Sequence, residues 1–286
     1  MGRIGVIGGS GLYKIEGIAN VREVAVETPF GEPSSKYILG ELEGKELVFL
    51  PRHGIGHRIS PTEINYRANI YGMKKLDVER IISISACGSL KEELRPMDFV
   101  VVDQFVDRTN YGRDMTFFRD GIVAHIEFSR PVCDVLSQQI YESAKSIGVR
   151  VHPKGTYLNM EGPAFSTLAE SNLYRSWGMD IIGMTNLAEA KLAREAEICY
   201  STLAAVTDYD CWHPTHESVS IDLVISYLTK NIENAKKILV SVLKNIDIER
   251  NCKCRDALKF AIMTDKSLIP EKTKKDLDII LGKYVK

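Results

Sequence analysis

Short apolar strands alternate with amphipathic helices along most of this chain. Apolar or β-branched residues at every second position predict strands, whereas apolar residues spaced three and four apart predict helices. Strands are predicted at 21–26, 36–42, 46–50, 80–89, 97–105, 155–162, 179–185 and 199–210. Helices are predicted at 61–75, 131–147, 167–177, 186–197 and 219–246.

Two of these helices carry clear start signals. Ser60 and Glu63 form a potential capping box for the helix at 61–75, because each side chain can bind the backbone of the other. Thr167 and Glu170 offer the same arrangement further along the chain.

The alternation of strands and helices predicts the fold class. It indicates an α/β fold with a mixed central β-sheet flanked by helices on both faces. No linker or composition shift marks a boundary, so we expect a single domain over 1–246. The charged segment 247–286 is expected to form a helical C-terminal extension packed on that domain.

Composition and charge narrow the class of partner. The 286 residues are 44% apolar and 26% charged, which is typical of a soluble globular protein. Since 37 basic residues balance 38 acidic ones, no global field would attract a nucleic acid or an acidic membrane. The sequence shows no leader peptide and no membrane-spanning run, so a cytoplasmic protein with a small-molecule substrate is expected.

The six cysteines leave two alternatives open. They are Cys87, Cys133, Cys199, Cys211, Cys252 and Cys254. No pair of Cys-x-x-Cys knuckles occurs, which argues against a structural zinc site. A cytoplasmic chain would usually hold free thiols, but only three glutamines occur, and this fits a thermophilic protein with at least one disulfide.

A glycine-rich turn follows the first apolar run, at "VIGGSGLY". A dinucleotide fingerprint fails there, because the third glycine that the pattern needs is replaced by Lys14. No Walker loop is present either. The turn can bring backbone N–H groups and the Ser10 hydroxyl close to an anion. The alternative is a tight turn that binds no ligand.

Other donors for an anion follow three further strands. Arg52 and His53 come after one strand, and arginine presents a fork that matches phosphate oxygens. Ser85 and the N–H of Ala86 follow another, and Thr185 a third. Each position alone fits ordinary surface polarity or packing. Four strand ends with such donors indicate a phosphate site.

Two carboxylates follow the strand at 199–210. Asp208 and Asp210 alternate on an extended backbone, so both side chains can face one ligand. Paired carboxylates suit a general acid, recognition of amino groups, or a magnesium ion. The alternative is a helix-capping aspartate beside a solvated one.

Together these motifs resemble those of the trimeric purine nucleoside phosphorylase family, and within it the members that cleave 5′-methylthioadenosine. The resemblance spans residues 3–246 and rests on ten motifs in order: "IGGSGLY", "TPFGEPS", "PRHG", "NYRANIY", "SACGSL", "DQFVDRT", "EGPAFST", "GMT", "AEICY" and "TDYDCW".

The resemblance implies reversible phosphorolysis of methylthioadenosine to adenine and 5-methylthioribose 1-phosphate. It implies no cofactor and no metal, since orthophosphate is itself a substrate. The implied phosphate-binding residues are Ser10, Arg52, His53, Ser85, Ala86 and Thr185. The implied substrate-binding residues are Phe165, Met184, Asp208, Tyr209, Asp210, Val224 and Ile225.

Asp208 is the implied catalytic acid, which would protonate the purine and therefore needs a pKa raised by burial. Relatives that act on 6-oxopurines carry asparagine there, because an amide can donate to a purine oxygen whereas a carboxylate accepts from amino groups. The main alternative is thus a broad-specificity purine nucleoside phosphorylase that also or mainly uses adenosine, inosine or guanosine. A nucleotide-binding module without turnover is a second alternative.

Specificity and assembly are also implied by the resemblance. Ile221 is expected to line the 5′ pocket, and Ser166 to influence base preference. His125 is expected to close the pocket of a neighbouring subunit. The chain is therefore expected to form a homo-oligomer, either a trimer or a dimer of trimers.

Overall fold

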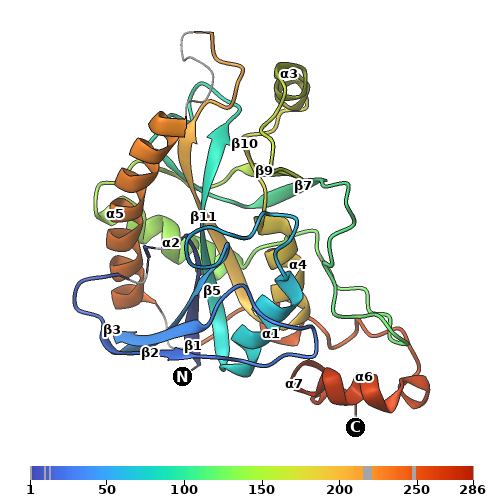
Figure 1. The fold of residues 1–286 in the computed structure, drawn as a ribbon. Coiled ribbons are helices and arrows are strands. Elements are labelled where there is room, and N and C mark those ends of the chain that lie inside the picture. Colours follow the sequence, from blue (N-terminus) through green and yellow to red (C-terminus); the bar gives the residue numbers. More distant parts are fainter. Residues whose placement is uncertain (1, 10, 13, 215–220, 247–248, 286) are drawn as a thin grey trace.

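A computed structural model describes residues 2–9, 11–12, 14–214, 221–246 and 249–285, with the backbone alone for 221–225. Figure 1 shows a mixed sheet with helices on both of its faces. The expectation of an α/β fold built on a mixed central sheet is confirmed. No helix of the described residues is long and apolar enough to span a membrane.

Eleven strands of the described residues form one sheet in which the path β2-β3-β4-β1-β5-β10-β9-β7 carries a branch through β11, β6 and β8. Their bounds are β1 Arg3–Gly8, β2 Ala19–Val24, β3 Tyr37–Leu42, β4 Lys45–Pro51, β5 Val78–Ser89, β6 Phe99–Val101, β7 Gln104–Arg108, β8 Val151–His152, β9 Thr156–Met160, β10 Ile181–Gly183 and β11 Cys199–Asp208.

The helices of the described residues lie between and after these strands. They are α1 Tyr66–Lys75, α2 Asp134–Ser146, α3 Leu168–Ser176, α4 Asn186–Glu195, α5 Ile221–Asn245, α6 Glu271–Asp276 and α7 Asp278–Leu281. Two 3₁₀ turns, Lys253–Asp256 and Lys266–Leu268, lie in the C-terminal segment.

Strand β5 is the central strand of the sheet, because β11 pairs with most of one side and β1 and β10 pair with the two ends of the other side. Its first half runs parallel to β1, with Ile7 opposite Ser83. Strand β11 runs parallel to β5 on the other side, from Cys199 opposite Arg80 onward. The last residues of β5 pair with the antiparallel β10. The main path of the sheet, through β10, and the branch through β11 therefore separate at this strand.

Each face of the sheet is covered by a separate apolar cluster (Figure 1). Helices α1 and α4 pack on one face, where Ile70 and Leu192 are fully buried. Helices α2 and α5 pack on the other, where Ile140 and Leu243 are fully buried. Burial of these apolar faces is the main force that holds the helices to the sheet.

The C-terminal segment packs against the same side as α1. Leu258, Ile280 and Leu281 belong to the apolar cluster that contains α1 and α4. The segment also pairs with a loop in the middle of the chain, because the His125 N–H donates to the Ala261 carbonyl over 2.8 Å.

The helix expected at 61–75 begins later than predicted. Only half of the expected capping box forms, because Glu63 accepts from the Ser60 N–H and hydroxyl while its own N–H donates to the Ser60 carbonyl, and the two residues close a turn and not a helix. The helix starts at Tyr66, where the Asn65 side chain accepts a hydrogen bond from the Ala68 N–H. Asn65 also donates to the Phe30 carbonyl, so a distant loop fixes the true helix start.

The strand expected at 97–105 is two strands. Strand β6 pairs with β11 and β8, whereas β7 pairs with β9. The chain changes partner at Asp103, whose carboxylate accepts a hydrogen bond from the Gly155 N–H over 2.9 Å. The capping box expected at Thr167 and Glu170 is confirmed at the start of α3.

All six cysteines are described, and all six are free thiols. The alternative with at least one disulfide is therefore not supported.

Replacing Leu258 by alanine tests whether the C-terminal segment is part of the core. Leu258 is 0% exposed, so we expect Leu258→Ala to lower the free energy of unfolding by about 2–5 kcal/mol. Urea denaturation at one fixed protein concentration would measure the change.

Leu268→Ala is the matched control, because Leu268 lies in the same segment but is 73% exposed. Its effect should stay within about 0.5 kcal/mol. Equal losses from both substitutions would contradict burial of the segment at Leu258.

Candidate active site

The carboxyl ends of four parallel strands meet at one edge of the sheet. Gly8 at the end of β1 lies opposite Pro51 of β4, and the Arg52 N–H donates to the Gly8 carbonyl over 3.0 Å. On the other side of β5, β11 brings Ala204 opposite Ser85. Ligands of open α/β sheets bind at such edges.

Arg52 lies beneath this edge and is 2% exposed. Its Nε is 2.5 Å from Glu189 Oε1, and its Nη2 is 3.1 Å from Glu189 Oε2. The fork of Arg52 was expected to face a phosphate, but it is occupied by this bidentate ion pair. Nη2 also donates to Ser83, and Nη1 to the Ile84 carbonyl. Described residues thus take four of its five N–H groups, and one on Nη1 remains.

Glu189 is the centre of a buried polar network. Its Oε2 accepts hydrogen bonds from Ser83 and from the Tyr200 hydroxyl, each over 2.8 Å. Asn186 donates to Ser83, Tyr200 and Thr202. The network satisfies the polar groups of β5, β11 and α4 at the place where these elements meet.

Sequence reasoning did not identify Glu189. The available signal was an acidic residue on the apolar side of a helix, between Ala188 and Ala190, both of which are buried. A buried carboxylate needs a partner, and the arginine that pairs with it lies 137 positions earlier in the chain.

His53 follows Arg52 and holds its imidazole in one orientation. Nδ1 is 2.8 Å from the Ile59 carbonyl, which can only accept, so Nδ1 carries a proton. Burial, together with the charge of Arg52, lowers the pKa of His53 to about 4. In the neutral ring Nε2 is therefore an acceptor, not the second donor expected from the sequence.

Ser85 and Thr185 come together around a tyrosine. The buried Tyr157 hydroxyl faces both the Ser85 hydroxyl and the Thr185 backbone, although burial dominates and raises the pKa of the phenol. Thr185 directly precedes α4, and Ala86 is exposed beside Ser85. The predicted donors of two strand ends thus converge next to Arg52.

Asp208 is the last residue of β11 and lies opposite Gly88 of β5. Its Oδ1 accepts a hydrogen bond from the Asp210 N–H over 2.8 Å, and its Oδ2 is 2.7 Å from the Thr207 hydroxyl. Gly88 leaves the space that the carboxylate occupies, because a Cβ there would lie 2.9 Å from Oδ1.

The surroundings of Asp208 favour its neutral form. Burial raises the pKa of Asp208 to about 6, despite hydrogen bonds from Thr207 and Asp210 that lower it. Thr207 also lies 3.2 Å from the Cys87 carbonyl. When the threonine hydroxyl donates to that carbonyl, a protonated Asp208 can donate to Thr207 Oγ1.

Asp210 lies beside Asp208 in a turn with φ of 51°. Burial raises the pKa of this carboxyl too, and its Oδ2 is buried without a hydrogen-bond partner among the described residues. Cys211 donates to the Ser166 carbonyl over 3.4 Å. Ser166, which was expected to influence base preference, therefore lies next to the carboxylate pair.

The two groups of residues are held apart by β5. Ser85 and Gly88 belong to the same strand and are three residues apart, which corresponds to about 10 Å. The hydroxyl donors lie at the Ser85 end, and the carboxylates lie at the Gly88 end. An anion and a basic heterocycle joined by a small ring would match this spacing.

Met184 directly precedes Thr185, and Phe165 lies in the segment between β9 and α3. Arg113 and Asn159 both donate to the Met184 carbonyl, which fixes the backbone before α4. Gly162, at φ of 73°, leaves space for the methionine sulfur, since a Cβ there would lie 2.5 Å from it. Phe165 is 57% exposed and has room for a ligand or another chain.

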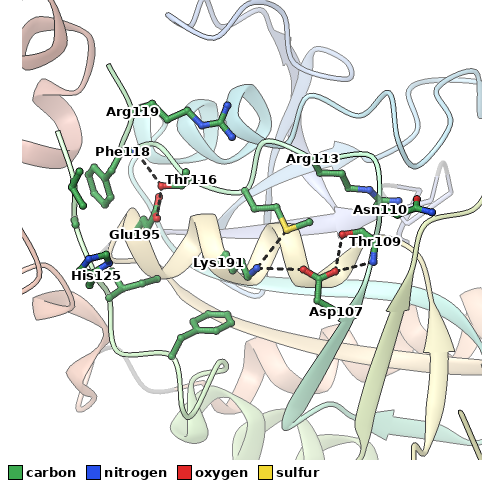
Figure 2. A pocket seen from close by; sticks show the side chains of 16 residues that line it. Asp107, Thr109, Asn110, Arg113, Thr116, Phe118, Arg119, His125, Lys191 and Glu195 are labelled. Atoms are coloured by element: carbon green, nitrogen blue, oxygen red, sulfur yellow. Dashed lines mark hydrogen bonds and ion pairs between the residues drawn. The ribbon is translucent and has the colours of Figure 1, made fainter. Parts of the chain in front are cut away.

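Two predicted residues lie away from this edge. Tyr209 packs with Trp212 and stacks on His213 with ring centroids 4.6 Å apart. His125 lines a separate hollow of about 740 Å³ (Figure 2). There it lies near Phe118 and Glu195, while Lys191 pairs with Asp107. The described residues that line this hollow include neither Arg52 nor Asp208.

Four predicted residues cannot be placed. Ser10 and the side chains of Ile221, Val224 and Ile225 lie outside the described residues.

Near the carboxylates, no third His, Cys, Asp or Glu of the described part of the chain completes a group of metal ligands.

Comparisons with known proteins identify the family of this chain. Residues 3–244 match the model of the phosphorylase superfamily. The S-methyl-5′-thioadenosine phosphorylase of Geobacter sulfurreducens is 60% identical over 282 residues, with 99% of each chain covered.

Solved structures give the same result. A methylthioadenosine phosphorylase from an Antarctic soil metagenomic library superposes with a TM-score of 0.93 at 46% identity, covering 98% of this chain and 99% of that one. The methylthioadenosine phosphorylase of Schistosoma mansoni in complex with adenine superposes with a TM-score of 0.82 at 37% identity, covering 90% and 96%.

A match over most of the chain, with such identity over nearly the full length of the relatives, establishes the family. The chain belongs to the phosphorylase superfamily and, within it, to the family of the S-methyl-5′-thioadenosine phosphorylases.

Proposed function

We propose that this protein catalyses the reversible phosphorolysis of 5′-methylthioadenosine to adenine and 5-methylthioribose 1-phosphate. The observation that carries the proposal is the partly buried Asp208, whose pKa is raised to about 6 and which lies opposite Gly88 of β5, three residues along that strand from Ser85. The relatives named above support the substrate.

The carboxylate pair acts on the base. Cleavage of the bond between the purine and the ribose builds negative charge on the base, so a proton delivered to nitrogen 7 lowers the barrier. Asp208 supplies that proton. Asp210 holds Asp208 through its backbone N–H and accepts a hydrogen bond from the 6-amino group. A carboxylate at position 208 thus favours adenine over 6-oxopurines.

The phosphate binds beside Ser85, three residues before Gly88 on β5. Ser85, the N–H of Ala86, Thr185 and the remaining N–H of Arg52 position it, together with Ser10 of the glycine-rich turn. Because Glu189 balances the charge of Arg52, the anion is held mainly by neutral donors and keeps its nucleophilicity. Nε2 of His53 accepts a hydrogen bond from a protonated phosphate oxygen.

The sugar lies between these groups. Met184 packs under the ribose, Phe165 borders the purine, and Ser166 tunes base preference. Ile221, Val224 and Ile225 form the apolar pocket for the methylthio group. His125 of the partner subunit closes that pocket in a trimer or a dimer of trimers. No cofactor or metal enters the reaction, because orthophosphate is the nucleophile.

Adenine release with and without phosphate tests the function. With methylthioadenosine as substrate, we expect adenine to form only when orthophosphate is present, in equal amount to 5-methylthioribose 1-phosphate. Chromatography of both products would measure this. Release without phosphate, or binding without turnover, would contradict the proposal. A higher kcat/KM for inosine would instead favour the broad-specificity alternative.

Asp208→Asn tests the acid. Without its proton, phosphorolysis of methylthioadenosine should slow by about 10²–10⁴-fold. In the unmutated enzyme kcat/KM should fall as pH rises through about 6, because the raised pKa keeps Asp208 protonated only below that pH. The variant should lack this decline and should use inosine relatively better. Steady-state kinetics across pH at fixed phosphate would measure both.

Asp265→Asn is the control, because Asp265 is an exposed residue that caps a turn in the C-terminal segment. It should leave the pH profile unchanged. An unaltered profile in Asp208→Asn would refute the assignment of the acid.

Glu189→Gln tests whether the buried pair positions Arg52. Loss of the countercharge leaves Arg52 buried and uncompensated, so the free energy of unfolding should fall by about 3–5 kcal/mol. Since the guanidinium is no longer held by its fork, KM for phosphate should rise while KM for the nucleoside changes little.

Glu195→Gln is a matched control on the same helix. Glu195 is also buried, but its carboxylate accepts from Thr116 and from the Phe117 N–H, away from the strand ends. It should alter stability without altering KM for phosphate. Equal shifts of that KM in both variants would show that Glu189 acts only on stability.

A further inference from the structure

Four cysteines from three distant parts of the chain meet at one point. The sulfur atoms of Cys133, Cys199, Cys252 and Cys254 all lie within 4.8 Å of one another. The sulfur atoms of Cys199 and Cys252 are 3.3 Å apart, which is well beyond a disulfide bond. Sequence spacing did not reveal the group, because only two of its members are close in sequence.

Rigid elements position these cysteines. Cys133 directly precedes α2, and its N–H donates to the Tyr200 carbonyl over 2.8 Å. Cys199 is the first residue of β11. Cys252 directly precedes the 3₁₀ turn that contains Cys254, in the segment after α5. The group therefore joins the C-terminal segment to a central strand and a covering helix.

We propose that Cys133, Cys199, Cys252 and Cys254 form a structural four-thiolate site for a zinc ion. Zinc binds four cysteines as a tetrahedron with Zn–S distances of about 2.3 Å, which places the sulfur atoms about 3.8 Å apart. The observed separations bracket that value. Cys133, Cys199 and Cys254 are buried, as expected of a closed structural site.

The charge around the cluster suits bound thiolates. Four thiolates and one Zn²⁺ leave a net charge of −2, which needs nearby compensation. Arg80 and Arg250 line the same small hollow as Cys133, Cys199 and Cys252, and Glu249 is the one acidic side chain of the described residues that lines it with them.

The arrangement favours one ion over two disulfides. A disulfide needs only pairwise approach, whereas here each sulfur lies close to all three others. That mutual convergence is what a single tetrahedral cation requires. The site lies at the start of β11, while Asp208 ends that strand, so its role is to fasten the C-terminal segment and not to take part in catalysis.

Metal analysis of the full-length protein tests the proposal. The protein would be purified under reducing conditions, incubated with zinc and freed of unbound metal by gel filtration. We expect about one zinc per chain by mass spectrometry. Cys254→Ser should lose most of it. Cys211→Ser, which alters a cysteine outside the cluster, should keep it.

A second measurement uses the unmutated chain, in case Cys254→Ser fails to fold. Co²⁺ in place of zinc should give the intense visible bands of a tetrahedral thiolate complex. A protein that takes up neither metal and shows six alkylatable thiols after denaturation would overturn the proposal. So would a disulfide between any two of the four cysteines.

Discussion

The buried ion pair between Arg52 and Glu189 is the interaction on which the candidate active site depends. It joins the end of β4 to α4 and, through Ser83, to β5. Burying two charges costs free energy unless both groups complete their hydrogen bonds. Here nearly all hydrogen-bonding groups of Arg52 and Glu189 have partners. The pair therefore has one stable geometry. Because Thr185 directly precedes α4, that geometry also sets where its backbone meets the strand ends.

This constraint gives the two ends of the site different electrostatic characters. At the phosphate end, the positive charge of Arg52 is balanced within the protein, so neutral hydroxyl and N–H donors are left to bind an anion. At the base end, burial and the neighbouring Asp210 make the ionised form of Asp208 costly. In the proposed reaction, one end holds a reactive anion without quenching it, and the other keeps a proton available for the leaving group.

Much of the fold and part of the site could be predicted from sequence, for identifiable reasons. The alternating strand and helix periods predicted the α/β architecture, and the polar residues at strand ends pointed to Ser85 and Asp208. Both signals are local in the sequence. Glu189 was missed since its partner is distant in the chain. The orientation of the Arg52 fork and the tautomer of His53 depend on tertiary contacts with Glu189 and Ile59, which no spacing rule encodes. The cysteine cluster was not predicted either, because its members come together only when three separate elements have folded.

Strand β5 has a consequence for how such a site can diversify. The two proposed subsites lie beside Ser85 and Gly88 of this one strand, which pairs with β11 over that stretch, so the interval between them is a fixed property of backbone pitch. Substitutions can change the side chains around the reacting atoms without altering the distance between the two subsites. Divergence of substrate preference is then confined to side chains that surround this interval, such as those at position 208 and in the segment around Phe165. The distance between the two subsites can therefore stay the same while the preferred substrate changes.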